Sequence, residues 1–216
     1  MRVLVDLDGV VYDWTGIYLR LYHELSGEEL PPDFRWEWHF MRQLPNTKAK
    51  SAITKSSRLW TEGVAYPGAI VALRELCLTH DTYIATQPGP RPDIAVPGKV
   101  AWLKRTAPWF DVERLICIKH KHLLQADTLI DDRPINLLSW KETNPRGIPL
   151  LMARPWNMAD RLNLSAFGTS RIPGTIERIG AGVVDNLAEA ARFLDDLETH
   201  EREISGNSLL QKRVTS

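Results

Sequence analysis

Two pairs of aspartates each follow a strand-like segment of this chain. Asp6 and Asp8 end the apolar run VLVDLDG, and Asp131 and Asp132 end the run TLIDDRP. Four carboxylates brought together would repel one another and raise one another's pKa values unless a cation lay among them. A hard divalent ion with oxygen ligands, Mg²⁺ by default, would remove that cost. The pattern therefore predicts a metal-dependent active site.

The same residue types indicate a class of reaction. A carboxylate beside Mg²⁺ can attack a phosphoryl group and form an aspartyl-phosphate. A second acid two residues further on can protonate the leaving oxygen and then activate water. A hydroxyl such as that of Thr86, together with a lysine, can hold the equatorial phosphate oxygens. Gly9 lets the backbone turn after the first pair and approach the phosphate closely.

Strands and helices that alternate along the chain must position these groups. Apolar, β-branched runs that predict strands occupy residues 2–7, 82–86, 115–118, 128–130 and 148–152. Patterns that predict helices occupy residues 67–77, 98–105, 135–141 and 184–202. This alternation predicts an α/β fold with a doubly wound parallel sheet. Such sheets bind ligands at the carboxyl ends of their strands, where both aspartate pairs and Thr86 are expected to meet.

About fifty residues interrupt the alternation after the first strand, far more than the usual two to six of a βα loop. They contain a predicted helix at 15–25, a Pro31-Pro32 turn, the aromatic stretch WEWHF and a predicted polar helix at 47–59. We interpret this segment as a small helical cap. The predicted organisation is a core of residues 1–13 and 67–200, a cap of residues 14–66 inserted after strand 1, and a frayed tail of residues 205–216.

Length and composition limit the class of protein. The 216 residues suit one domain, or a core with a small insertion. The 27 basic and 27 acidic residues leave no net charge, which argues against a polymeric nucleic acid as partner. No apolar run approaches the roughly 20 residues that span a bilayer, and the N-terminus lacks a signal-peptide layout. With two cysteines, Cys77 and Cys117, interpreted as reduced core residues, we expect a soluble cytoplasmic protein.

The motifs together resemble a known superfamily. Asp6-Leu7-Asp8-Gly9-Val10, Thr86, a lysine and Asp131-Asp132 are similar to the four motifs of the haloacid-dehalogenase-like (HAD) phosphohydrolases. Within that superfamily, VLVDLDGVVYDW, YPGAIVALREL, IATQP and TLIDDRP resemble the 5′(3′)-deoxyribonucleotidase family in order and roughly in spacing, over about residues 2–157. The resemblance implies a Mg²⁺-dependent phosphomonoesterase that acts on nucleoside monophosphates.

The resemblance also implies roles for the acidic residues. Asp6 would be the nucleophile and Asp8 the general acid and base. The metal would be held by the Asp6 carboxylate, the Asp8 backbone carbonyl and one of the second pair. Asp132 is favoured as the direct ligand, with Asp131 behind it.

The phosphate-binding residues follow in the same way. Thr86 and Gln87 fall on the phosphate-binding position, although the family usually has a second small hydroxyl residue where this chain has Gln87. Lys121 lies ten residues before Asp131, which matches the family's phosphate lysine, and Lys99 is the alternative.

Three tryptophans are candidates for contacts with the nucleobase. Trp14 stands eight residues after Asp6, where the nucleotidases have an aromatic residue that contacts the base. Trp36 and Trp38, with Phe40, resemble the aromatic pair that the family's cap places over the base. Stacking of a base on an aromatic ring contributes roughly 1–3 kcal/mol. In the alternative interpretation, these rings only form the core of the cap.

Two other functions remain open at this point. One is a phosphatase for another small phosphoester such as a sugar phosphate, against which the aromatic residues argue. The other is a catalytically silent binding module, against which the intact set of Asp6, Asp8, Lys121 and Asp132 argues. A homodimer is compatible with the sequence, and no feature of the sequence fixes the oligomeric state.

Overall fold

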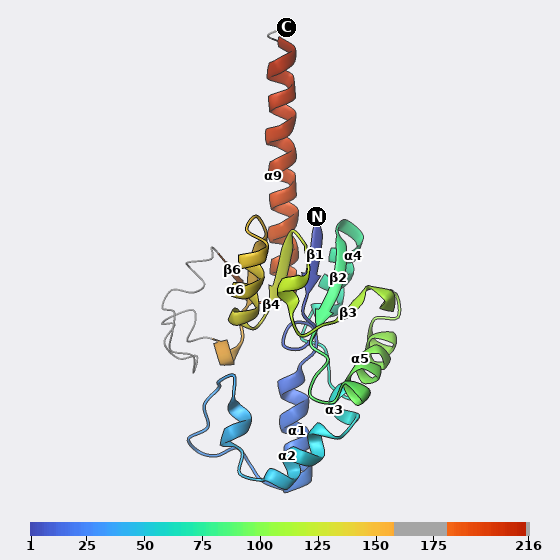
Figure 1. Cartoon of the computed structure of the whole chain (residues 1–216), viewed down its shortest axis with the longest axis vertical. Coiled ribbons are helices and arrows are strands. Elements are labelled where there is room, and N and C mark those ends of the chain that lie inside the picture. The colour runs from blue at the N-terminus through green and yellow to red at the C-terminus, as the bar shows by residue number, and fades with distance from the viewer. Residues whose placement is uncertain (158–180, 215–216) are drawn as a thin grey trace.

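One parallel sheet of six strands organises the computed structural model, which describes residues 1–157 and 181–214 (Figure 1). The strand order is β3-β2-β1-β4-β5-β6. The strands are β1 (Arg2–Val5), β2 (Asp81–Thr86), β3 (Leu115–Cys117), β4 (Thr128–Asp131), β5 (Ile148–Met152) and β6 (Gly182–Val184). The predicted doubly wound parallel sheet is therefore confirmed. The three-residue β6 was not predicted.

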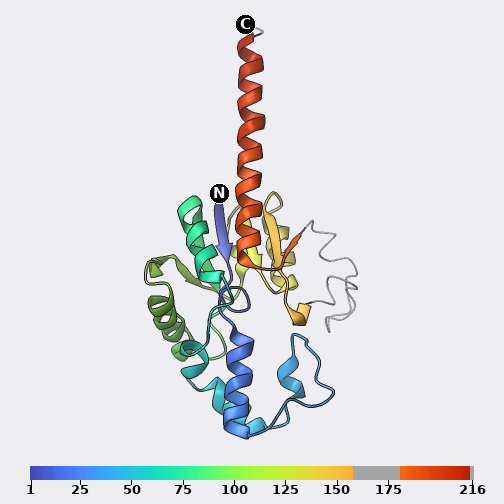
Figure 2. The ribbon, with the colours of Figure 1, turned by 180° about the vertical axis from the view of Figure 1, so that it is seen from behind.

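The strands could be predicted from apolar runs in the sequence because both faces of the sheet are buried. Val3 and Val5 share a core with α4 (Ala69–Thr79) and α9 (Leu187–Val214), whereas Leu4 belongs to a second core with α6 (Pro134–Thr143). Because side chains alternate across a strand, each face needs its own helical layer. Figure 2 shows α4 and α9 together on one side of the sheet.

The remaining helices are α1 (Trp14–Ser26), α2 (Thr47–Thr54), α3 (Arg58–Thr61) and α5 (Pro92–Thr106), with short 3₁₀ turns η1 (Phe40–Gln43), η2 (Val112–Arg114), η3 (Lys121–Leu123) and η4 (Pro155–Asn157). Of these helices, α1 lies close to its predicted position, whereas α5 begins at Pro92, before the predicted start at 98, and the predicted helix over 47–59 is divided. The prediction of one helix over 47–59 is wrong, because the chain leaves the helix between α2 and α3. There the Ser56 hydroxyl accepts a hydrogen bond from the Arg58 amide, an alternative to helical pairing that serine offers.

The last helix is longer than its sequence pattern predicts. α9 continues to Val214, and thus through most of the segment 205–216 for which a frayed tail was predicted. Once a helix has formed, each further residue costs little, so a weak amphipathic pattern does not fix its end. Figures 1 and 2 show its far end projecting from the body of the molecule. Residues 158–180, which the prediction assigned to the core, lie outside the described residues.

Residues 14–66, inserted between β1 and α4, lie beyond the carboxyl edge of the sheet. Helices α1, α2 and α3 all come from residues 14–66 and gather at the end of the molecule opposite the projecting part of α9 (Figure 1). α1 begins at an Asp13 cap, whose side chain accepts a hydrogen bond from the Gly16 amide, and ends at Gly27.

In the part of the chain that the structure describes, no helix is both long and apolar enough to cross a membrane.

Candidate active site

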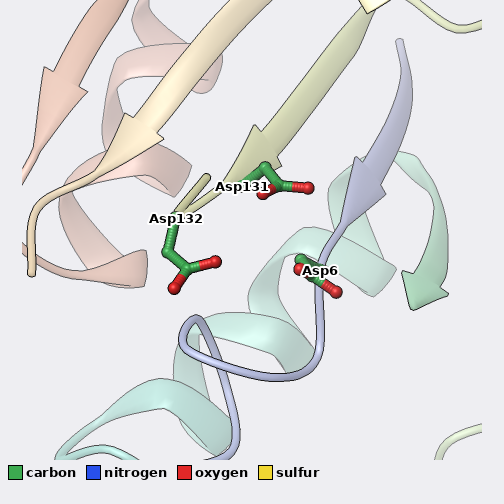
Figure 3. A group of neighbouring side chains, drawn as sticks. All are labelled: Asp6, Asp131 and Asp132. Atoms are coloured by element: carbon green, nitrogen blue, oxygen red, sulfur yellow. The ribbon is translucent and has the colours of Figure 1, made fainter. Parts of the chain in front are cut away.

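Three carboxylates gather where the two central strands end. Asp6 follows β1, Asp131 is the last residue of β4, and Asp132 comes next (Figure 3). Because β1 and β4 are neighbours, paired at Val5 and Ile130, their ends bring these side chains together. One oxygen of each carboxylate lies within 4.8 Å of the others, and all three residues are buried. The structure thus places these three predicted ligands in one cluster.

A buried lysine contacts two of the three carboxylates, and its single positive charge balances one of them. The Nζ atom of Lys121, in η3, lies 2.9 Å from Asp6 Oδ2 and 2.5 Å from Asp131 Oδ2. Asp131 also accepts hydrogen bonds from the Arg133 amide and the Asn136 side chain. Asp131 is therefore already saturated by protein donors, whereas the cluster as a whole keeps an excess of negative charge.

The pKa values of Asp6 and Asp132 are both raised in this buried cluster. Burial raises the pKa of Asp6 to about 7, and the charges of Asp131 and Asp8 add to the rise while Lys121 opposes it. Burial, with the charges of Asp131 and Asp6, also raises the pKa of Asp132 well above its ordinary value. A bound cation would favour the ionised form of both groups, so the cluster suits a metal ion.

A second lysine holds the remaining aspartate. The Nζ atom of Lys99, on α5, lies 2.6 Å from Asp8 Oδ2, 2.7 Å from Thr86 Oγ1 and 2.7 Å from the Gln87 carbonyl oxygen. Lys99 is almost fully buried, whereas the Asp8 side chain is 26% exposed. The structure therefore brings both candidate lysines to the site, each beside a different aspartate of the first pair.

Asp132 has contacts of another kind, which the sequence analysis missed. The indole Nε1 of Trp156, in η4, donates a hydrogen bond of 2.8 Å to Asp132 Oδ2. Asn157 Nδ2 donates one of 2.7 Å to the Asp132 backbone carbonyl. Both residues follow the carboxyl end of β5, so applying the strand-end rule to the fifth strand would have found them.

A cavity of about 220 Å³ opens above the carboxylates. Its polar side includes Asp6, Asp8, Gln87, Asp132 and Arg133, which come from the core. Its apolar side includes Trp14, Trp38, Phe40, Met41 and Trp60, which come from residues 14–66. The cavity lining therefore combines charged and aromatic side chains, and a ligand with one anionic end and one flat apolar end would match both.

The three predicted tryptophans differ in whether they line the cavity. Trp14 lines the cavity and stacks on Tyr18, with ring centres 5.1 Å apart. Trp38 also lines the cavity, and the Arg133 guanidinium lies 4.6 Å from the centre of its ring. Trp36 is 46% exposed and packs against Phe34, away from the described lining of the cavity.

Trp60 is, like Trp156, an aromatic lining residue that was not predicted from the sequence. Its side chain is buried and its ring lies 5.1 Å from Lys99 Nζ, while a Cβ atom at Gly98 would lie 2.5 Å from the Trp60 Cβ atom. The WTEG sequence around it carries no motif, and only the packing of α3 against α5 brings it to the site.

Curated relatives are similar to about 62% of the chain. It is 30% identical over 143 residues to the human mitochondrial 5′(3′)-deoxyribonucleotidase, covering 62% of this chain and 63% of the relative. It is 32% identical over 145 residues to the mouse mitochondrial protein, covering 62% and 65%. It is 32% identical over 143 residues to the human cytosolic type, covering 62% and 71%. The matches thus span less than two thirds of the mitochondrial relatives' length.

Solved structures support the fold. The magnesium-bound HAD-type protein YfnB of Bacillus subtilis superposes with a TM-score of 0.55 at 15% identity, covering 90% of this chain and 98% of the other. A haloacid-dehalogenase-like family protein of Streptococcus pneumoniae gives 0.53 at 15% identity, covering 89% and 97%. Residues 1–163 match the family described as 5′ nucleotidase, deoxy (pyrimidine), cytosolic type C protein. Because that match spans well over half of the sequence, the chain belongs to this family.

Proposed function

We propose that this protein is a Mg²⁺-dependent phosphomonoesterase that removes phosphate from nucleoside monophosphates through an aspartyl-phosphate. The observation that carries the proposal is a cavity that is lined both by Asp6 and Asp132, two members of the carboxylate cluster, and by aromatic side chains from residues 14–66. Family membership and relatives named as deoxyribonucleotidases support the nucleotide substrate and favour a deoxyribose.

The donor set suits a hard cation. Asp6 and Asp132 would hold the metal together with the Asp8 backbone carbonyl, an all-oxygen set of the kind that Mg²⁺ prefers. Asp131 would stay behind them, because Lys121, Asn136 and the Arg133 amide already occupy its oxygens. When bound, the metal would supply positive charge that stabilises the phosphoryl oxygens.

The chain's own groups account for the two half-reactions. Asp6 would attack phosphorus; its Oδ1 accepts a hydrogen bond from the Leu7 amide, and Lys121 lies against Oδ2, so the carboxylate is held in place. Asp8 would donate its proton to the leaving oxygen of the ester. It would then take a proton from the water that attacks the aspartyl-phosphate, which releases inorganic phosphate and restores both aspartates.

The remaining expectations extend this proposal. Residues 14–66 would act as the cap that holds the nucleobase between Trp14 and Trp38, both of which line the cavity. The substrate would be a free nucleotide rather than a nucleic acid, since the chain carries no net charge. We propose the cytosol as the site of action; relatives of both the mitochondrial and the cytosolic type match this chain. The homodimer stays a prediction.

Phosphate release from a panel of nucleoside monophosphates and sugar phosphates, with Mg²⁺ and with EDTA, tests the proposal. We expect metal-dependent release that is fastest with deoxyribonucleotides. Release from sugar phosphates alone would keep the chemistry but refute the nucleotide substrate. No release from any compound would favour a silent binding module, which titration with nucleotides would then detect.

A substitution tests the covalent mechanism. Asp6→Asn removes the nucleophile, so phosphate release should fall by about 10³-fold or more while the thermal unfolding temperature stays close to that of the wild type. Asp196→Asn, on the exposed face of α9, is the matched control and should leave activity unchanged. Normal turnover by Asp6→Asn would exclude an aspartyl-phosphate.

A further inference from the structure

The hydrogen bond from Trp156 to Asp132 has no role in the chemistry described so far. We propose that Trp156 is a positioning residue, whose indole N–H orients the Asp132 carboxylate for the metal ion. This inference rests on the proposed metal site. It begins from a contact of 2.8 Å between Trp156 Nε1 and Asp132 Oδ2, both in the buried part of the site.

Asp132 differs from its two neighbours in the charge of its partner. Asp6 and Asp131 both form ion pairs with Lys121. Among the side chains that the structure describes, no lysine, arginine or histidine forms an ion pair with Asp132, and its carboxylate accepts a hydrogen bond from a neutral indole. A neutral donor fixes one oxygen without cancelling the charge, whereas a lysine in its place would compete with the cation. The other oxygen and the negative charge therefore stay available to a metal ion.

The surroundings restrict Asp132 from other directions too. Asn157 Nδ2 donates to the carbonyl oxygens of both Asp132 and Met152, at 2.7 and 2.8 Å, which ties the end of β4 to the end of β5. The Gly9 backbone also lies against the carboxylate, since a Cβ atom there would come within 2.2 Å of Asp132 Oδ2. The Gly9 backbone and the Trp156 indole thus both adjoin Oδ2, and the indole hydrogen bond fixes that oxygen in place.

Trp156 also lines the cavity, so a direct role in substrate binding has to be separated from this one. A positioning role through the metal ligand predicts weaker metal binding even when no substrate is present. It also predicts that a high Mg²⁺ concentration restores turnover, with an unchanged KM for the substrate. A residue that only binds substrate would show the reverse: normal metal affinity and a raised KM.

The test is direct metal binding by the full-length protein without substrate, using Mn²⁺ followed by electron paramagnetic resonance and Mg²⁺ followed by calorimetry. Trp156→Phe keeps an aromatic ring and removes the N–H group, so both affinities should fall by about 10- to 100-fold. Trp140→Phe is the matched control: Trp140 is also buried and donates its N–H, but to the Leu124 carbonyl oxygen and not to a carboxylate. Its affinities should equal those of the wild type. Equal affinities for Trp156→Phe would overturn the inference.

A second measurement needs no functional variant. In the ¹⁵N-labelled wild type, the indole resonance that Trp156→Phe lacks belongs to Trp156, and it should shift in a saturable way with Mg²⁺. If that variant does not fold, selective assignment of the same resonance in the wild type replaces it. If the chemical shift of this resonance does not change at Mg²⁺ concentrations where calorimetry shows binding, the contact between Trp156 and the metal ligand is refuted.

The outcomes separate this inference from the function on which it rests. Metal binding that depends on Trp156, in a protein that releases no phosphate from the panel, would support the positioning role and refute the esterase. Phosphate release by a protein whose metal affinity is unchanged in Trp156→Phe would do the opposite.

Discussion

Lys99 and Lys121 approach the first aspartate pair from different elements, α5 and η3, and each contacts one member of it. Lys121 spans Asp6 and Asp131, whereas Lys99 joins Asp8 to Thr86 and to the Gln87 carbonyl. Burial lowers the pKa of Lys121, but the charges of Asp131 and Asp6 outweigh it, so the pKa is raised and the ammonium stays charged. The two lysines therefore contact different carboxylates, and each has its own set of partners.

Replacing Lys99 by methionine tests the role of the second lysine. Lys99→Met keeps a long buried side chain but leaves Asp8 without its cation, so the acid and base steps should slow by about 10²-fold. Turnover measured at saturating Mg²⁺ checks this, with metal affinity expected to change little because Lys121 and Asp132 are untouched. Lys104→Met, on the exposed side of the same helix, should behave as the wild type. Full activity in Lys99→Met would refute a role in positioning Asp8.

The raised pKa of Asp6 predicts how metal binding depends on pH. The folded protein binds a proton at Asp6 more tightly than the unfolded chain, so the metal-free protein loses stability as pH rises from about 4 to about 7. Mg²⁺ competes with that proton, and with the one at Asp132, for the same oxygens. The rise in unfolding temperature on adding Mg²⁺ should thus be larger at about pH 8 than at about pH 5. An equal rise at both values would contradict proton competition.

At the residue scale, a site residue could be predicted from the sequence when its position relative to a strand was clear. Asp6 and Asp132 could be predicted because they directly follow β1 and β4, and Asp8 because it lies two residues after Asp6; strand ends have a fixed place in this fold. Lys121, which follows β3, was favoured for the phosphate over Lys99, which lies within α5, but only their packing shows which carboxylate each one reaches. Trp156 carries no charge, so nothing in its residue type pointed to a metal ligand.

At the scale of elements, the turn after β1 depends on a glycine. Gly9 has φ +78°, in the left-handed region, and faces Asp132. Gly27, which ends α1, has φ +68° but no atom within 4 Å of an added Cβ. A side chain at Gly27 therefore adds backbone strain alone, whereas a side chain at Gly9 adds both backbone strain and a steric clash with Asp132.

Substituting alanine at both positions uses this difference. Gly27→Ala should lower the free energy of unfolding by about 1–2 kcal/mol, the cost of a side chain in the left-handed region. Gly9→Ala should cost more and should also abolish Mn²⁺ binding, because its Cβ displaces the Asp132 carboxylate. Urea unfolding in EDTA, with metal binding measured separately, gives both quantities. Intact metal binding in Gly9→Ala would show that the loop can move away.

The sequence predicted elements with a strong pattern and missed those without one. The strands β1 to β5 were predicted from their apolar residues, because both faces of the sheet are buried. β6 is as short as β3, but it offers only two apolar residues after Gly182 and was missed. The break between α2 and α3 depends on a local serine hydrogen bond, which hydrophobic periodicity does not register.

At the scale of the whole molecule, the cavity lies between the sheet edge and residues 14–66, so substrate preference should depend on both parts. Trp38→Ala removes a ring that lines the cavity, and the KM for nucleoside monophosphates should rise by about 10- to 100-fold. Trp36→Ala, an exposed ring two residues away, is the matched control and should leave the KM unchanged. Steady-state kinetics with a nucleotide and a sugar phosphate would check this. Equal effects of the two variants would mean that the rings only stabilise the segment.

The strand order also has a consequence for how the protein is made. The first strand, β1, lies between β2 and β4, and the Arg2 amide donates a hydrogen bond to Asp127, 125 residues away in sequence. During synthesis at about 5–20 residues per second, Asp6 would emerge from the ribosome roughly 6–25 s before Asp131 and Asp132. A nascent chain would thus carry its nucleophile without the partner carboxylates. The capacity to hold a metal ion would arise only once β4 had been translated and had entered the sheet beside β1.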